Sequence, residues 1–264
     1  WLVNLSDRYV IGYFLGIASV GIYSAGATLG VIPYTFFGIM SFVQVAALPK
    51  LYDEGKIDEV KAHLRYWMKY FLTLTIPFTF GAALLGEPIL RIFSTHEIAS
   101  QGYLVVPVTA LATVFLCTHH IVSHILFLVK KTTMMAAIWI VAAALNIGLN
   151  ILVVPIMGVI GAAITTLIAY ALALGVVSYY AFKEFRFTID WHFIIKSLIA
   201  SAIMSVAVWL MAPQGFLDTI LTVVAGVAIY TVMLVLLRGF SKEEVSFFWR
   251  LFRRKASIAF PDDN

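Results

Sequence analysis

The chain has 264 residues, of which 62% are apolar and only 12% are charged, and its mean hydropathy is +0.96. Soluble domains are about half apolar and about a quarter charged, so this composition excludes a water-soluble fold. Stretches of about 20 apolar residues recur along nearly the whole chain, and a helix of that length crosses a bilayer. The sequence therefore predicts an all-α polytopic membrane protein, built as a transmembrane helix bundle.

Charge and cysteine content narrow the function further. The formal net charge is +4, which the excess of Lys and Arg in the cytoplasmic loops of membrane proteins explains without a nucleic-acid partner. The single cysteine, Cys117, excludes an internal disulfide and supplies no redox or metal framework, so we expect no cofactor and no metal. The chain begins at Trp1 inside an apolar run without a signal peptide, and we expect it to be a fragment of a longer protein.

Apolar runs separated by charged breaks predict eight helices. They are expected over residues 1–17 (truncated), 22–48, 66–86, 101–129, 132–155, 158–182, 193–212 and 216–237. Between the second and third helices, the mixed-charge segment 58–65 carries apolar residues at helical spacing. It is interpreted either as a short interfacial helix or as a solvated connector.

The joints between these helices alternate in charge. The joints at 18–21, 156–157 and 213–215 hold no Lys or Arg, and 87–100 holds only Arg91. Basic residues gather instead in 49–65, 130–131, 183–186 and after 238. Because basic loops stay inside, we expect these joints and the C-terminus to be cytoplasmic in a multi-pass protein of the inner membrane.

The tail over residues 241–264 has an amphipathic pattern. Ser241 and Glu244 form a capping box, and an apolar face beside several arginines follows. This pattern predicts a cytoplasmic helix that lies on anionic membrane lipids.

Two charged residues fall inside the first predicted helix. Asp7 and Arg8 lie ten or eleven residues before the joint at residue 18, about 15 Å deep at 1.5 Å per residue, which predicts the bilayer midplane. Adjacent helix positions diverge, so we expect each side chain to seek a partner on another helix. Arg8 is interpreted as a ligand for phosphate oxygens, and the alternative for both residues is a structural ion pair between helices.

A polar stripe follows one face of the fourth predicted helix, because its members are three or four residues apart: Thr109, Thr113, Cys117, His120 and His124. Two histidines at this spacing hold a metal only with a third ligand, and none follows at the usual spacing. His120 and His124 are therefore interpreted as contacts for phosphate or for a coupled proton. The alternative is that both imidazoles simply pack against a neighbouring helix.

Other polar and small residues predict how the helices pack. Asn146 and Asn150 share a face near the outer end of their helix, which predicts hydrogen bonds between helices or a role in ion coupling. Three prolines are expected to interrupt helices, at Pro33, Pro77 and Pro107, and threonines at 75 and 79 flank the second of them. Gly16 and Gly21 are expected to flank a tight joint with a left-handed backbone. The small residues of one helix are expected to let a neighbouring helix approach closely, at Gly158, Gly161, Ala162 and Ala163.

Two stretches carry a resemblance to a known family. The first runs from Asp7 to Gly16 and continues through Val20–Ala25 to Leu48–Leu51, and the second runs from Asn146 to Leu152 and on to Ala163. Both resemble the polysaccharide (O-antigen, Wzx-type) branch of the multidrug/oligosaccharidyl-lipid/polysaccharide flippase superfamily.

The resemblance implies an architecture. Members have two six-helix bundles, often followed by two more helices. On this basis residues 1–182 form the second bundle, residues 183–240 the two additional helices, and residues 241–264 the tail. The first bundle is missing from this sequence, and because transport takes place between the bundles, we do not expect the chain to transport alone.

The resemblance also implies a function. It predicts a transporter, not an enzyme, that moves an isoprenoid-pyrophosphate-linked oligosaccharide to the outer leaflet by alternating access, for surface polysaccharide biosynthesis. Its implied partners are the lipid-linked oligosaccharide, the first bundle, a polysaccharide polymerase and glycosyltransferases. Alternatives are a multidrug or cation antiporter of the same superfamily and a membrane-embedded transferase. The implied substrate-binding residues are Arg8, His120 and His124, with Asp7, Asn146 and Asn150 in ion coupling or structure.

Overall fold

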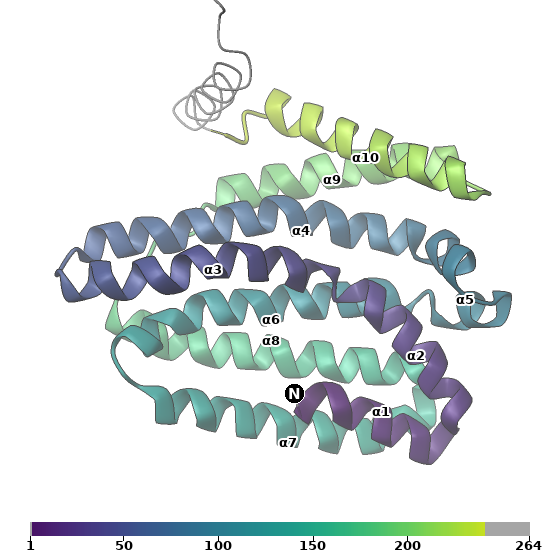
Figure 1. The fold of residues 1–264 in the computed structure, drawn as a ribbon, viewed down its shortest axis with the longest axis horizontal. Coiled ribbons are helices and arrows are strands. Elements are labelled where there is room, and N and C mark those ends of the chain that lie inside the picture. The colour runs from purple at the N-terminus through teal and green to yellow at the C-terminus, as the bar shows by residue number, and fades with distance from the viewer. Residues whose placement is uncertain (1, 241–264) are drawn as a thin grey trace, which may run out of the picture.

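The computed structural model describes residues 2–240, and this part of the chain forms ten α-helices (Figure 1). They are α1 (Leu2–Leu15), α2 (Ile17–Gly30), α3 (Ile32–Asp53), α4 (Ile57–Phe93), α5 (His96–Gly102), α6 (Val105–Leu128), α7 (Thr132–Met157), α8 (Val159–Glu184), α9 (Trp191–Met211) and α10 (Phe216–Leu236). The predicted amphipathic tail over 241–264 lies outside the described residues.

Six of these helices, α4 and α6 to α10, are long and apolar enough to cross a membrane. A seventh candidate span is the pair formed by α2 and the first part of α3, which is bent by 42° at the break between them. The predicted fold class, a polytopic helical bundle, is confirmed. The first of the eight expected helices corresponds to α1, which has 14 residues.

The joint between α1 and α2 is a single residue and not the predicted segment 18–21. Gly16 has φ +85°, a left-handed conformation that glycine adopts without a steric penalty, so the chain turns within one residue. Residues 18–21 are therefore the first turn of α2. Gly158 was expected at a close contact on a helix, but it turns the chain between α7 and α8 with φ +68°, and a side chain added there would meet nothing within 4 Å.

The predicted prolines differ in their effect. Pro33 stands in the first turn of α3, just after the bend, where its missing N–H has no helical partner to lose. Pro77 lies inside α4. Pro107 does not interrupt a helix as expected, because α6 begins only at Val105 and the proline occupies its first turn.

The segment 58–65 is neither a separate interfacial helix nor a solvated connector. It forms the first turns of α4, a helix of 37 residues, and its apolar face is turned into the bundle. Val60 and Leu64 are fully buried and join a core cluster with Leu48 of α3 and Trp67 of α4. The apolar spacing that suggested a membrane surface is instead satisfied by packing between α3, α4 and α6.

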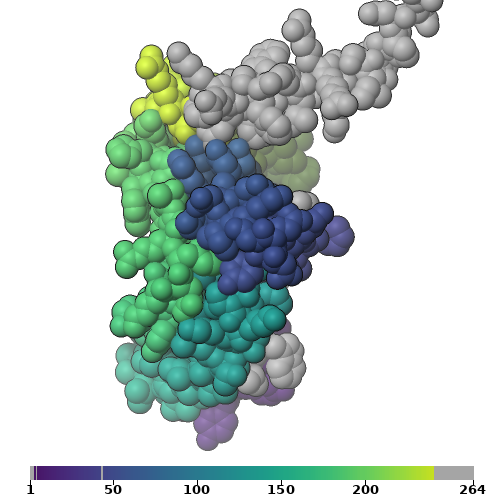
Figure 2. Space-filling view, turned by 90° about the vertical axis from the view of Figure 1, so that its left-hand side faces the viewer, coloured from purple at the N-terminus to yellow at the C-terminus, as the bar shows by residue number. Residues whose placement is uncertain are grey.

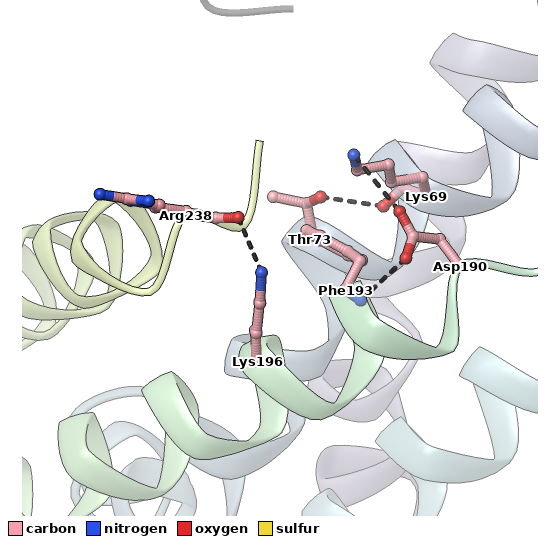
Figure 3. A network of polar contacts seen from close by, with 6 residues as sticks. All are labelled: Lys69, Thr73, Asp190, Phe193, Lys196 and Arg238. Carbon is pink, nitrogen blue, oxygen red and sulfur yellow. Dashed lines mark hydrogen bonds and ion pairs between the residues drawn. The ribbon is translucent and has the colours of Figure 1, made fainter. Parts of the chain in front are cut away.

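Helices α9 and α10 pack on each other and on α4, and Figure 3 shows polar contacts at this junction. Asp190 caps α9 by accepting a hydrogen bond of 3.0 Å from the N–H of Phe193. The same carboxylate lies 3.7 Å from the ammonium of Lys69 in α4. Lys196 of α9 donates a 3.0 Å hydrogen bond to the main-chain oxygen of Arg238 at the end of α10. These contacts hold the last two helices in register with α4.

The basic joints gather at one end of the bundle. The α3–α4, α6–α7 and α8–α9 joints and the end of α10 all lie on the left in Figure 1, and Figure 2 views this end. Lys131 of the α6–α7 joint bridges Glu184 at the end of α8 at 2.6 Å. The poorly charged joints lie at the opposite end (Figure 1). The alternation predicted from charge therefore corresponds to two distinct ends of the structure.

Candidate functional site

A buried carboxylate lies at the centre of a polar cluster between four helices. Asp7 of α1 is fully buried, and three donors surround it. Its Oδ2 accepts hydrogen bonds from the hydroxyls of Tyr23 (2.6 Å) and Thr166 (2.7 Å), and its Oδ1 accepts from the amide of Asn150 at 2.6 Å. The prediction that Asp7 finds its partners on other helices is confirmed, with amide and hydroxyl groups in place of a cation.

A second set of hydrogen bonds closes the cluster. Asn146 donates to the hydroxyl of Thr166 at 3.0 Å and accepts from Ser6 at 2.9 Å. Thr165 donates to the amide oxygen of Asn150 at 2.5 Å. The predicted inter-helix bonding of the two asparagines is thus confirmed. We call the set the Asp7 cluster, and it comprises Ser6, Asp7, Tyr23, Asn146, Asn150, Thr165 and Thr166.

The chemistry of the Asp7 cluster follows from its burial. A buried carboxylate is costly unless it is paired. Within residues 2–240, Asp7 is contacted by uncharged hydrogen-bond donors and by no Lys or Arg side chain. Carboxylate, amide and hydroxyl oxygens are also the ligands that hard cations prefer. The arrangement can therefore either lock four helices together or exchange its donors for a bound cation or a proton.

The small residues of α8 allow this convergence. Ala162 and Ala163 are buried and pack with Ile11 of α1 in one core cluster. A side chain added at Gly161 would meet Val153 of α7 at 3.1 Å. The predicted close approach at these positions is confirmed, and it brings the threonines of α8 within reach of both α1 and α7.

Arg8 points the opposite way from its neighbour. Its side chain is exposed, and it makes no hydrogen bond or ion pair with any residue in 2–240. Arg8 lies seven residues before Leu15, the last residue of α1, or about 10 Å along the helix axis. The predicted depth of about 15 Å is therefore too large, because α1 ends at residue 15 and not at residue 17. The expected helix partner of Arg8 is not found among the described residues.

His120 and His124 lie on the other half of the bundle, in α6, and aromatic rings surround them. The His120 ring stacks on Phe37 of α3 with centroids 5.6 Å apart and lies 5.8 Å from Trp139 of α7. His124 donates from Nδ1 to the main-chain oxygen of His120 at 2.8 Å and meets the edge of Trp67 at 5.0 Å. This packing fits the alternative interpretation, yet both histidines remain partly exposed.

Both histidines also line a pocket of about 260 Å³. The pocket lies between α3, α6 and α7, near the end that carries the basic joints. Its walls are largely apolar, and Ser123 adds one hydroxyl beside the two imidazoles. The lining residues are Val45, Pro49, His120, Ser123, His124, Phe127, Leu128 and Met135.

Two threonines of the Asp7 cluster escaped the sequence analysis, and a third histidine of α6 lies off the predicted polar stripe. His119 is 1% exposed, and neither of its ring nitrogens has a hydrogen-bond partner among the described residues. Its ring instead meets Trp139 at 4.8 Å. Thr165 and Thr166 are the clearest omissions, because two hydroxyls inside an apolar helix, directly after a run of small residues, are a signal for inter-helix bonding. In the described part of the chain, no three His, Cys, Asp or Glu side chains form a metal site.

A family model and several curated proteins match this chain. The model of the family described as Lipid II flippase MurJ matches residues 2–217. The chain is 28% identical over 181 residues to "Probable flippase AglR" of Haloferax volcanii, covering 65% of this chain and 38% of that protein. It is 25% identical over 244 residues to "Probable lipid II flippase MurJ" of Thermotoga maritima, covering 89% of this chain and 49% of that protein.

A solved structure shows the same fold. The structure titled "Lipid II flippase MurJ, inward closed conformation" superposes with a TM-score of 0.74 at 21% identity, covering 90% of this chain and 50% of that one. A further relative, "Probable low-salt glycan biosynthesis flippase Agl15" of Haloferax volcanii, is 22% identical over 238 residues, which is 87% of this chain and 49% of that protein. The chain thus spans half or less of the length of these relatives.

Proposed function

The chain belongs to the lipid II flippase MurJ family, and on that basis we propose that it forms one half of a flippase for lipid-linked oligosaccharides. The transporter would move an isoprenoid-pyrophosphate-linked glycan across the cytoplasmic membrane by alternating access, for the synthesis of a surface polysaccharide. The relatives named above carry flippase names for lipid II or for glycan biosynthesis. The proposal concerns transport and involves no catalytic step.

One observation carries the proposal: Arg8 is an exposed cation inside an apolar helix and has no partner among the described residues. An unpaired charge within the hydrocarbon layer is costly, so it requires an anion or water. The planar guanidinium holds two phosphate oxygens at once. We assign Arg8 the role of binding the pyrophosphate of the lipid carrier.

The histidine pocket is proposed as a second contact for the substrate. The Nδ1–H of His124 is engaged with His120, which leaves Nε2 of the neutral imidazole as an acceptor. The pocket is apolar apart from His120, His124 and Ser123, so it suits a lipid-linked headgroup that presents both polar and apolar parts. Its position near the basic end of the bundle supports a role on the side where substrate is loaded.

The Asp7 cluster is proposed as the site of ion coupling. Asp7, Asn146 and Asn150 offer oxygens from two helices, and a bound sodium ion or proton would replace the donors that now saturate the carboxylate. Since the cluster links α1 and α2 to α7 and α8, occupancy would bias how these helices pack. Coupling of this kind requires only that the ion binds one arrangement more tightly than the other.

The proposal requires a second unit. Alternating access needs a cavity between two parts that move relative to each other. We propose that a first helical bundle supplies that partner, that a polymerase and glycosyltransferases act on the same lipid-linked glycan, and that the tail rests on anionic lipids. A multidrug antiporter would favour several buried carboxylates, whereas Asp7 is the only buried Asp or Glu side chain in residues 2–240.

Surface glycan in a strain that lacks the chromosomal gene tests this function. In the complete protein, Arg8→Lys keeps the positive charge but loses the planar guanidinium that binds two phosphate oxygens, so we expect reduced export. Arg8→Gln and Arg8→Ala should abolish export while the protein remains abundant in the membrane. Normal glycan with Arg8→Ala would contradict the assignment. Loss of abundance in all three variants would show instead that Arg8 stabilises the fold, and would remove it from the substrate site.

A further inference from the structure

Two tyrosines on α1 expose most of their side chains. Tyr9 is 75% exposed and Tyr13 is 85% exposed. They are four residues apart, so their rings project from the same side of the helix, about 6 Å apart along its axis. Neither hydroxyl bonds to a residue in 2–240, and the ring of Tyr13 only meets the edge of Phe14 at 4.9 Å. Arg8 precedes Tyr9 directly and is exposed as well.

The outer face of α10 offers a comparison within this chain, and exposed aromatic residues also occur on α8 and α9, among them Tyr179 and Trp209. On α10 the exposed large residues are aliphatic apart from the terminal Phe216, and they include Leu217 (72%), Val224 (61%) and Leu236 (68%). On α1 the exposed residues include Arg8, Tyr9 and Tyr13, together with Phe14, which is 42% exposed. A phenol hydroxyl that faces hydrocarbon loses its hydrogen bonds with water. The exposed face of α1 is therefore built for an aqueous cavity.

A belt of aromatic residues at the membrane surface would explain only part of this pattern. Tyr13 lies two residues before Leu15, about 3 Å from the end of α1, where such belts occur. Tyr9 lies six residues before Leu15, about 9 Å inside, and is next to the charged Arg8. A belt residue has no reason to lie at that depth beside a cation, whereas a ligand that crosses the membrane passes this position.

We propose that Tyr9 and Tyr13 form a stacking platform for the sugar rings of the substrate, next to the pyrophosphate held at Arg8. This inference rests on the proposed function. The apolar C–H face of a pyranose packs flat on an aromatic ring, and the phenol hydroxyl meets the sugar hydroxyls. Two rings one helical turn apart can each take one of two successive sugars, with the pyrophosphate at the inner end.

The platform predicts a defined pattern of specificity. Ring stacking depends on the flat face that most pyranoses share, so the platform recognises that a glycan is present and discriminates weakly between glycans. Tyr9→Phe keeps the ring and loses only the hydroxyl, whereas Tyr9→Leu removes the ring. The leucine variant should therefore be the more severe of the two if stacking provides the contact.

Binding to the complete protein in nanodiscs tests the platform with two probes. Lipid II presents two sugars on undecaprenyl pyrophosphate, and undecaprenyl pyrophosphate alone lacks them. We expect Tyr9→Leu and Tyr13→Leu each to weaken lipid II binding about three- to tenfold, as loss of an aromatic contact does, and to leave undecaprenyl pyrophosphate binding unchanged. Arg8→Ala should weaken both. Tyr179→Leu changes a tyrosine of α8 that is 60% exposed, so it serves as the control and should change neither.

The outcomes separate the platform from the flippase function. If wild-type protein binds neither probe, the proposed function fails. If it binds both probes equally, or if the tyrosine variants bind lipid II like wild type, the platform is refuted while the flippase proposal stands. If the tyrosine variants lose both probes together, the tyrosines act on the fold and not on the sugars, which also refutes the platform.

Discussion

The hydroxyl of Tyr230 in α10 donates a 2.9 Å hydrogen bond to the main-chain oxygen of Thr73 in α4. Pro77 lacks the N–H that would otherwise bond this oxygen four residues earlier. The threonines beside the proline do not replace it: Thr75 bonds the oxygen of Phe71, and Thr79 bonds that of Thr75. The carbonyl freed by the proline is thus satisfied from another helix, which joins α10 to the middle of α4.

Tyr230→Phe should destabilise the protein. The substitution removes the donor to Thr73 and the 2.9 Å contact with Ser197, leaving buried polar groups unpaired at a cost of about 1–3 kcal/mol. Thermal unfolding of purified protein in detergent measures the effect as a lower Tm. Tyr34→Phe is the control, because the Tyr34 hydroxyl bonds to no described residue. Equal Tm values for both variants would mean that the Thr73 carbonyl finds water instead.

Gly30→Ala should open the interface between α2 and α6. A Cβ at Gly30 would lie 2.6 Å from Cβ of Thr109 and 3.0 Å from the main-chain nitrogen of Ala110. Neither atom can move without the helix, so we expect a loss of about 1–3 kcal/mol, read as a lower Tm. Gly38→Ala in α3 meets nothing within 4 Å and should be neutral or slightly stabilising. A neutral Gly30→Ala would show that α2 packs less closely on α6.

Asp7→Asn should uncouple the Asp7 cluster from cations. The NH2 group of the new asparagine would face another hydrogen-bond donor, either Asn150 or the hydroxyls of Tyr23 and Thr166. The lost hydrogen bonds should destabilise the fold by about 1–3 kcal/mol. If Asp7 holds a cation, added sodium or a lower pH should raise the Tm of wild type but not of the variant. Asp218→Asn, at an exposed carboxylate, should behave like wild type. A wild-type Tm that is independent of both ions would contradict a coupling role.

The sequence predicted the helical fold and the paired asparagines well, because apolar run length and helical spacing are local properties. The details that failed depend on tertiary packing. The face that carries Val60 and Leu64 looks the same whether it meets a membrane or another helix, and only the structure shows that it meets α3. The left-handed conformation of Gly16 was predicted, but the length of the joint was wrong, since this one glycine replaces the expected four-residue joint.

The candidate site was also predicted only in part, because its contacts depend on tertiary packing. Asp7 and Arg8 are adjacent in sequence, and the spacing indicated that they diverge, but it could not show which of them is buried. The partners of Asp7 come from residues 16 to 159 positions away, among them Tyr23 and Thr166. Such contacts depend on the small residues of α8, and a single sequence does not reveal which helix they approach.

The two ends of the bundle should face opposite sides of the membrane. Reporter fusions after Asn264 and within residues 87–100 should give opposite signals, with the C-terminal fusion cytoplasmic, because the basic joints gather at one end. A fusion between Lys130 and Lys131 serves as the internal control and should match the C-terminal one. The same signal from the tail and from residues 87–100 would contradict the orientation and the number of spans.

Translocation by the complete protein in proteoliposomes tests most directly whether Arg8 serves a pyrophosphate-recognising flippase. The assay follows transfer of fluorescent lipid II from one leaflet to the other. We expect wild type to exceed protein-free vesicles, Arg8→Ala to be at least about tenfold slower, as loss of a charge-assisted contact implies, and Arg8→Lys to lie between them. Arg91→Ala, which removes an exposed cation paired with Glu87, should transport like wild type. Transport by Arg8→Ala at the wild-type rate, or no transport by wild type, would contradict the account.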